Sequence, residues 1–136
     1  MVPVLMTREM DYALRVLRAL HQNGQQSAAA IAQREHMPKA ITLKLLKRLR
    51  AAGLVDSRRG PSGGYLLQRS CGELYLGDLF QALEEPVFVN RCQQPGYRCE
   101  NRSDEGCSLC RELSRIQLAL DEELHKTPLS EIFQNP

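Results

Sequence analysis

The sequence predicts a mainly α-helical fold with one small β-hairpin, followed by a long C-terminal helix. Apolar residues recur at spacings of three and four along the first fifty residues, two short apolar runs flank a Gly/Pro turn at 54–68, and a leucine-rich helical pattern returns after residue 108. A chain of 136 residues is long enough for one domain with a sizeable core and too short for two. We therefore expect a single domain with an appendage.

Three helices are predicted in the N-terminal part of the chain. Residues 7–21 have the spacing of an amphipathic helix, which Thr7 can cap. Ser27 can cap a short second helix. Pro38 is suited to a first helical turn and opens the basic stretch "PKAITLKLLKRLRAAG", in which Gly53 stands where a C-terminal cap belongs.

A β-hairpin is predicted directly after the third helix. The runs "LVDS" at 54–57 and "GYLLQ" at 64–68 flank the turn sequence "RRGPSG". Helix, short helix, basic helix and hairpin follow one another in the order of a winged helix-turn-helix, whose third helix reads DNA. A further helix is expected at 74–85, before an irregular stretch that begins at Pro86.

The charge is divided unevenly along the chain. Residues 1–70 carry 12 Lys and Arg against 4 Asp and Glu, whereas residues 71–136 carry 6 against 12. A basic first half is typical of a protein that binds a polyanion such as DNA, although a solvated basic helix face is the simpler alternative. The glycine-rich turn lacks the strand-to-helix setting and the Lys-Ser/Thr ending of a nucleotide-binding loop.

The candidates for DNA contact lie at the start of the third helix and in the hairpin turn. The helix can approach base edges and phosphates in the major groove, and an arginine in the turn can enter a narrow minor groove. The candidates are Lys39, Ala40, Thr42, Leu43, Lys44, Lys47 and Arg48 from the helix, and Arg58, Arg59, Gly60 and Ser62 from the hairpin.

Four of the five cysteines are clustered at Cys92, Cys99, Cys107 and Cys110. No apolar run has the length of a membrane span or the flanks of a signal peptide, so we expect a cytoplasmic protein without membrane contact. Clustered thiols in a reducing compartment are more often metal ligands or redox sensors than disulfides. The irregular gaps favour neither zinc nor an iron-sulfur cluster. Cys71, outside the group, is interpreted as an incidental small residue.

The C-terminal helix carries a leucine-rich seam that predicts a contact with a partner helix, most simply in a homodimer. Packing of the helix against its own domain is the alternative. The seam consists of Leu109, Leu113, Ile116, Leu120 and Leu124. Together with the other patterns, it predicts a DNA-binding domain at 1–85, a cysteine-rich loop at 86–107, and a dimerisation helix with a C-terminal tail at 108–136.

Three segments resemble the Rrf-two family of bacterial transcription regulators, in particular its iron-sulfur members of the IscR and NsrR type. They are "LMTREMDYALR" at 5–15, "PKAITLKLLKRLRAAGLV" at 38–55 and "SRRGPSGGYLL" at 57–67. The resemblance implies a homodimer that binds a partly palindromic operator in double-stranded DNA, with the long helix crossing between subunits. It also implies that Arg59 enters the minor groove and that Lys39 to Lys44 cover the base-reading positions. Leu43 stands where a family member has a base-reading glutamate, so the resemblance implies DNA binding without specifying the operator sequence.

The same resemblance implies a cofactor, a 2Fe-2S cluster in each subunit. Cys92, Cys99 and Cys107 match three cysteine ligands of the family, and Cys110 stands where a histidine ligand is found in some members. The alternative fourth ligand is Asp11 from the other subunit, which would make the cluster 4Fe-4S and nitric oxide a plausible signal.

The sequence therefore predicts a DNA-binding transcriptional regulator controlled by an iron-sulfur cluster, not an enzyme. No nucleotide-binding fingerprint or set of nucleophile and base stands out in the sequence, and no small-molecule substrate is expected. The alternatives are a winged-helix protein with a structural zinc ion, or a metal-free thiol switch in which Cys107 and Cys110 form a reversible disulfide.

Overall fold

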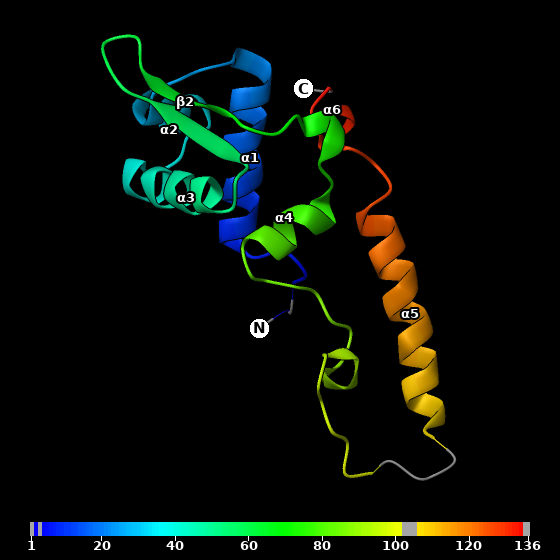
Figure 1. The fold of residues 1–136 in the computed structure, drawn as a ribbon. Helices are drawn as coiled ribbons and strands as arrows, with labels where there is room; N and C mark the ends of the chain where they lie inside the picture. The colour runs from blue at the N-terminus through cyan, green and yellow to red at the C-terminus, as the bar shows by residue number, and fades with distance from the viewer. Residues whose placement is uncertain (1, 3, 102–105, 135–136) are drawn as a thin grey trace.

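The winged helix-turn-helix and the long helix α5 form two parts of the molecule that lie side by side (Figure 1). A computed structural model of the chain describes residues 2, 4–101 and 106–134. The fold class agrees with the prediction, since the described residues are mainly helical and hold a two-stranded hairpin. The elements are α1 (Arg8–Asn23), α2 (Ala28–Arg34), α3 (Lys39–Ala51), β1 (Val55–Arg58), β2 (Gly64–Leu67), η1 (Cys71–Glu73), α4 (Leu76–Ala82), η2 (Arg91–Gln93), α5 (Ser108–Leu124) and α6 (Leu129–Ile132).

The first two helices begin at the residues that the sequence predicts as caps. Thr7 Oγ1 accepts a hydrogen bond from the Met10 amide at 3.3 Å, and Ser27 Oγ accepts one from the Ala30 amide at 3.1 Å. Each hydroxyl satisfies an amide that has no partner within its helix. The helix α3 starts directly after Pro38, again as predicted.

The hairpin is antiparallel, and it is tied to the helices at its base. Val55 pairs with Leu67 and Arg58 with Gly64, while Gln26 and Tyr65 exchange backbone hydrogen bonds of 3.0 and 2.7 Å. These bonds hold β2 against the turn before α2. The tip extends away from the helices (Figure 1), which is the position of a wing.

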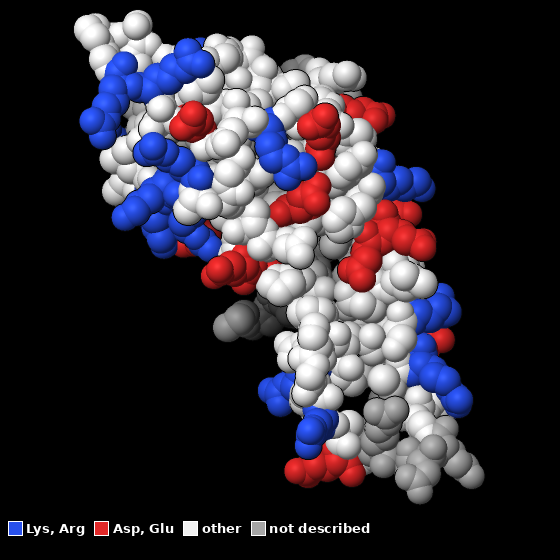
Figure 2. Space-filling model, viewed as in Figure 1, with Lys and Arg blue, Asp and Glu red and all other residues white. Residues whose placement is uncertain are grey.

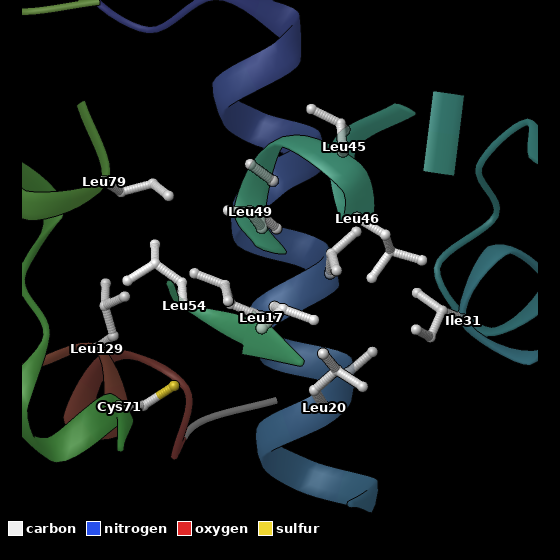
Figure 3. Packing of buried hydrophobic residues seen from close by; sticks show 14 of the residues in the cluster. Leu17, Leu20, Ile31, Leu45, Leu46, Leu49, Leu54, Cys71, Leu79 and Leu129 are labelled. Carbon is white, nitrogen blue, oxygen red and sulfur yellow. The ribbon is translucent and has the colours of Figure 1, made fainter. Parts of the chain in front are cut away.

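One hydrophobic core joins α1, α2 and α3 to the hairpin, α4 and the C-terminal tail (Figure 3). Leu17, Leu45 and Leu49 are fully buried at its centre. Cys71 faces the same core with 1% of its surface exposed, and burial raises the pKa of its thiol to about 11. The sequence interpretation of Cys71 as an incidental small residue did not place it in the core, where the structure buries it.

The C-terminal tail packs into this core, which the sequence-based division at residue 108 did not anticipate. Leu129 and Phe133 are 1% and 5% exposed. The Leu129 amide donates to Leu74 O at 2.8 Å, and Gln22 Nε2 donates to Phe133 O at 2.9 Å. Only two apolar residues, four apart, mark the short helix α6, so its pattern was too brief to indicate a helix.

The chain leaves the core after α4, runs away from the wing, and returns along α5 (Figure 1). The helix α4 covers 76–82, fewer residues than the predicted 74–85, because Asp78 Oδ2 accepts a hydrogen bond from the Tyr75 amide at 2.9 Å and fixes its start. Within the part of the chain that the structure describes, no helix is both long enough and apolar enough to cross a bilayer.

Candidate metal centre and DNA interface

The exposed side of α3 and the hairpin turn form a basic surface. Lys and Arg side chains gather over the hairpin and α3 in the upper left of Figure 2. Leu43 is 43% exposed among them. The exposed candidates are Lys39, Ala40, Leu43, Lys44 and Lys47 on α3, and Arg58, Arg59, Gly60 and Ser62 in the hairpin.

Thr42 corrects one of the predicted DNA contacts. Its side chain is fully buried, and its hydroxyl donates to Pro38 O at 3.0 Å. Thr42 lies three and four residues before Leu45 and Leu46, on the face of α3 that turns toward the core. The prediction that Thr42 contacts DNA is therefore wrong.

Glu9 on α1 binds two of the other candidates. Lys44 Nζ lies 2.6 Å from Glu9 Oε1, and the Arg48 guanidinium bonds the second carboxylate oxygen. The hydrogen bond from Lys44 is the main reason why the pKa of Glu9 is lowered. Arg48 also donates to Leu83 O at 2.7 Å and is half-buried, so it links α3 to the end of α4 and is less available to phosphate than Lys39 or Lys47.

The turn of the wing requires glycine at position 63. The Gly63 amide donates to Gly60 O at 2.9 Å, and a Cβ added to Gly63 would lie 2.3 Å from Arg58 O. The tight turn leaves Arg59 exposed beside it.

All four clustered cysteines line one cleft of about 710 Å³ between the 86–107 loop and the first turns of α5. Cys92 comes from η2, Cys110 from the first turn of α5, and Cys107 is the residue before that helix. The part of α5 that lines the cleft is its first turns, and this end of the helix lies far from the wing (Figure 1).

Cys92 and Cys110 are neighbours in this cleft. Gln93 Nε2 lies 3.4 Å from Cys92 Sγ and 3.7 Å from Cys110 Sγ, and Asn90 Nδ2 lies 3.4 Å from Cys92 Sγ. The pKa of the Cys92 thiol is lowered, mainly by the hydrogen bond from Gln93 and further by hydrogen bonds with Cys110 and Asn90. Donors of this kind stabilise a thiolate, the form in which cysteine binds metals.

The donor set fits a soft metal or cluster. Four thiols open onto one cleft, and thiolates are the preferred ligands of iron-sulfur clusters and zinc. Cys99 is exposed, and among the described residues no three metal-binding side chains converge on one point. Binding through all four thiols therefore requires the loop to rearrange so that the four sulfurs come closer together.

Gln117 is a residue of the site that the sequence interpretation missed. Its side chain is 8% exposed, accepts from the Val89 amide at 2.8 Å and donates to Val87 O at 2.9 Å. A faint signal exists, because Gln117 falls at helical spacing between Leu113 and Leu120 as a polar residue on an apolar face.

The residues of the predicted seam on α5 do not all face the same surroundings. Leu109 and Ile116 are 63% and 39% exposed, whereas Leu124 packs against the core of its own chain. Leu113 and Leu120 are half-buried. The homodimer contact stays a prediction, and its most exposed part is the face of Leu109 and Ile116.

Asp11 lies on α1, where Arg15 Nη2 is 3.2 Å from its carboxylate. The proposed ligand role concerns the other subunit of a dimer, so it stays a prediction.

Comparison with known proteins decides the family. The model of the Rrf2 family, described as iron-dependent transcriptional regulators, matches residues 6–135. The chain belongs to the Rrf2 family. Its relatives are transcription regulators rather than enzymes, in agreement with the prediction.

Individual Rrf2 proteins are similar to this chain in sequence or in fold. The HTH-type transcriptional regulator IscR of Xenorhabdus nematophila is 41% identical over 87 residues, which cover 60% of this chain and 53% of that protein. The chain thus spans about half the length of the curated relatives it matches. The solved structure of CymR, the global cysteine regulator of B. subtilis, is 30% identical with a TM-score of 0.72, covering 98% of this chain and 97% of that one. The T. potens IscR structure, 22% identical with a TM-score of 0.69, covers 96% and 87% and supports the fold alone.

Proposed function

We propose that this Rrf2 protein is a homodimeric DNA-binding regulator whose operator affinity is controlled by an iron-sulfur cluster. The observation that carries the proposal is that Cys92, Cys99, Cys107 and Cys110 line a single cleft. Four thiolates complete the usual ligand number of a cluster, and a 2Fe-2S cluster in each subunit is the favoured form. The similarity to relatives named IscR also supports control by an iron-sulfur cluster.

The DNA-binding part of the proposal rests on the exposed basic surface. Lys39 and Lys47 lie on the solvent side of α3, where a recognition helix meets the major groove, and Arg59 lies at the wing. Two such surfaces in a dimer would read a partly palindromic operator, with half-sites about one helical turn or a multiple of it apart. Because operator DNA lies in the bacterial cytoplasm, we also infer a cytoplasmic location.

When bound, the cluster supplies reversible one-electron chemistry and sensitivity to oxidants. The residues of this chain set its environment. Cys110 in place of a histidine gives an all-thiolate ligand set, which favours a lower reduction potential because thiolate donates more electron density. The amide of Gln93 reaches the Cys92 and Cys110 sulfurs, and such hydrogen bonds tune the potential in the opposite direction.

A chain of contacts leads from the cleft to the recognition helix. At the far end of α5, His125 lies against Gly77 of α4, with its Nε2 3.7 Å from Asp78 Oδ1. The other end of α4 accepts the hydrogen bond from Arg48 of α3 at Leu83 O. Binding that orders the 86–107 loop against α5 can shift α4 and α3 through these contacts, provided that the two arrangements differ in free energy with and without the ligand.

Three alternatives use the same cleft differently. Asp11 of the partner subunit with three cysteines would hold a 4Fe-4S cluster. A zinc ion would hold the loop without redox chemistry. A metal-free protein would act as a thiol switch.

Anaerobic purification of the full chain tests the proposal. We expect a coloured protein with visible charge-transfer absorption, two iron and two sulfide ions per chain for a 2Fe-2S cluster, and operator affinity that changes when the cluster is removed. Cys110→Ala should lose the cluster or change its spectrum, whereas the matched Cys71→Ala, in the core, should keep it.

A colourless protein with about one zinc ion per chain would show that the site holds a structural zinc ion and not a cluster. Four iron ions per chain, lost in Asp11→Ala, would assign the 4Fe-4S alternative. A Cys110→Ala protein with full occupancy and an unchanged spectrum would exclude Cys110 as a ligand.

A further inference from the structure

Gln117 fixes the cysteine loop on α5. Its amide group bonds the backbone of two alternate loop residues, the Val89 N–H at 2.8 Å and the Val87 carbonyl at 2.9 Å. It also donates to Asp121 Oδ1, one turn further along α5, at 3.0 Å. These bonds use both N–H groups and the oxygen of the buried amide, so they favour one register of the loop relative to the helix.

That register brings together two cysteines that are distant in sequence. Cys92, three residues after Val89, lines the same cleft as Cys110, and the side-chain amide of Gln93 lies within reach of both sulfurs. Gln93 Nε2 lies 3.4 Å from one sulfur and 3.7 Å from the other, and 3.5 Å from Cys110 O. Both side chains are half-exposed and line a cleft that a small oxidant can enter.

We propose that Cys92 and Cys110 are the oxidisable pair of the metal-free protein, and that hydrogen peroxide converts them into an intramolecular disulfide. Sequence spacing favoured Cys107 and Cys110 for such a bond, whereas in the structure the Gln93 amide lies within reach of the Cys92 and Cys110 sulfurs. The inference rests on the proposed function only in its consequence: a disulfide at these positions withdraws two of the four proposed ligands, so oxidised protein cannot take up a cluster.

The chemistry is a two-electron oxidation. One thiol attacks a peroxide oxygen, the O–O bond breaks, and a sulfenic acid and one water form. The sulfur of the second cysteine then attacks the sulfenic sulfur, the S–S bond forms and the second water leaves. In total, two thiols and one hydrogen peroxide give one disulfide and two waters, and a thiol reductant reverses the step.

Peptide mapping of the metal-free full chain tests the pair. After peroxide treatment and alkylation, trypsin separates the Cys92 peptide, 92–98, from the peptide 103–111, which holds Cys107 and Cys110. We expect the two peptides to be joined, with the loss of two hydrogen atoms, and to separate again after reduction. A bond closed within 103–111, or a link to Cys99, would overturn the proposal.

Single substitutions identify the partner of Cys92. Cys110→Ser should abolish the joined peptides, while Cys107→Ser and the core variant Cys71→Ser should retain them. Joined peptides that persist in Cys110→Ser, or vanish in Cys107→Ser, would overturn the assignment.

Gln117→Met tests the positioning role because it keeps the side-chain length and removes both loop hydrogen bonds. We expect disulfide formation to slow by roughly tenfold, the effect of losing bonds that hold the loop in register. If circular dichroism shows a folded chain and the rate of disulfide formation is unchanged, Gln117 does not position Cys92 and Cys110. Since every arm uses metal-free protein, failure of the cluster proposal would leave this outcome unaffected.

Discussion

At the residue scale, the surroundings of a side chain decide whether it can serve the function that its type suggests. Lys44 and Arg48 are basic residues on the recognition helix, yet both are bonded to Glu9. Thr42 stands at a position that base contact would require, and its hydroxyl is turned inward to Pro38 O. Among the described residues of α3, Lys39 and Lys47 are therefore the basic groups most available to DNA, together with the arginines of the wing.

Arg59→Ala is expected to weaken operator binding by about tenfold or more, because a minor-groove arginine and its phosphate neighbours contribute strongly to affinity. The slope of log affinity against log salt should fall by about one for each phosphate that no longer has a cationic partner. Fluorescence anisotropy at several salt concentrations measures both quantities. Arg69→Ala, an exposed arginine beyond β2, is the matched control and should leave both unchanged. Equal affinity and slope in Arg59→Ala would remove Arg59 from the interface.

Glu9→Gln is expected to reduce stability at neutral pH and to have less effect in acid. The pKa of Glu9 is lowered in the folded chain, so its contribution is present above the pKa of the unfolded state and disappears as pH falls through the folded value. Because its side chain is 35% exposed, solvent screening limits the effect to well under about 1 kcal/mol. Urea unfolding at neutral and acidic pH measures it.

Glu112→Gln is the control for this pH dependence. Glu112 also has a lowered pKa, through Arg115 on the same exposed helix face, and its removal should leave stability nearly unchanged. A Glu9→Gln protein with an undiminished acid transition would contradict the role of Glu9.

At the element scale, the C-terminal end of α5 packs closely against α4. Gly77 is buried there, and a Cβ on it would lie 2.1 Å from His125 Cε1. His125 is held in place by Asp121 O, 2.8 Å from Nδ1, so its ring cannot turn aside without losing that bond. We expect the cleft at one end of α5 to influence the winged helix at the other through this contact.

Gly77→Ala should therefore destabilise the chain by about 1–3 kcal/mol, the usual effect of overpacking a filled site. The double variant Gly77→Ala with His125→Ala should recover most of this loss, because the ring is what the added methyl group meets. Thermal unfolding of the single and double variants measures the coupling. Gly72→Ala, where the nearest atom lies 3.4 Å from the added Cβ, should be tolerated. Additive effects in the double variant would contradict the contact.

At the scale of the whole molecule, the amphipathic helix α5 has an apolar face that its own chain leaves exposed. Leu109 and Ile116 are on this face, while Leu124 is used by the core. An exposed apolar face of this kind is typical of a helix that packs against a partner helix. We expect a second copy of the chain to cover it, which would place two wings on one operator.

Ile116→Asp is expected to convert the dimer into a monomer, because a carboxylate in an apolar helix contact loses its hydration. Sedimentation or light scattering over a range of concentrations measures the change. Leu118→Asp is the matched control, since Leu118 is 61% exposed and lies on the opposite side of α5. A dimer that survives Ile116→Asp and dissociates with Leu118→Asp would place the contact on the other face.

Local sequence features predicted the elements because the physics that forms them is local. Thr7 and Ser27 cap helices through bonds to residues three positions away, and the glycine-rich turn at 60–64 closes the hairpin over a few residues. The cysteine cluster and the wing sequence can also be recognised in the sequence. They predicted the family and the candidate metal centre.

Only the tertiary structure decided which of these residues meet. Packing rather than spacing buries Thr42 and joins Gln117 to the loop. Packing also places the Cys92 and Cys110 sulfurs around the amide of Gln93. The return of Leu129 and Phe133 to the core is of the same kind. Such contacts depend on where whole elements come to rest, and the free energy that selects them is spread over the core. The sequence alone therefore determined the three N-terminal helices, the hairpin and the donor chemistry, while the fold determined the neighbours of each donor.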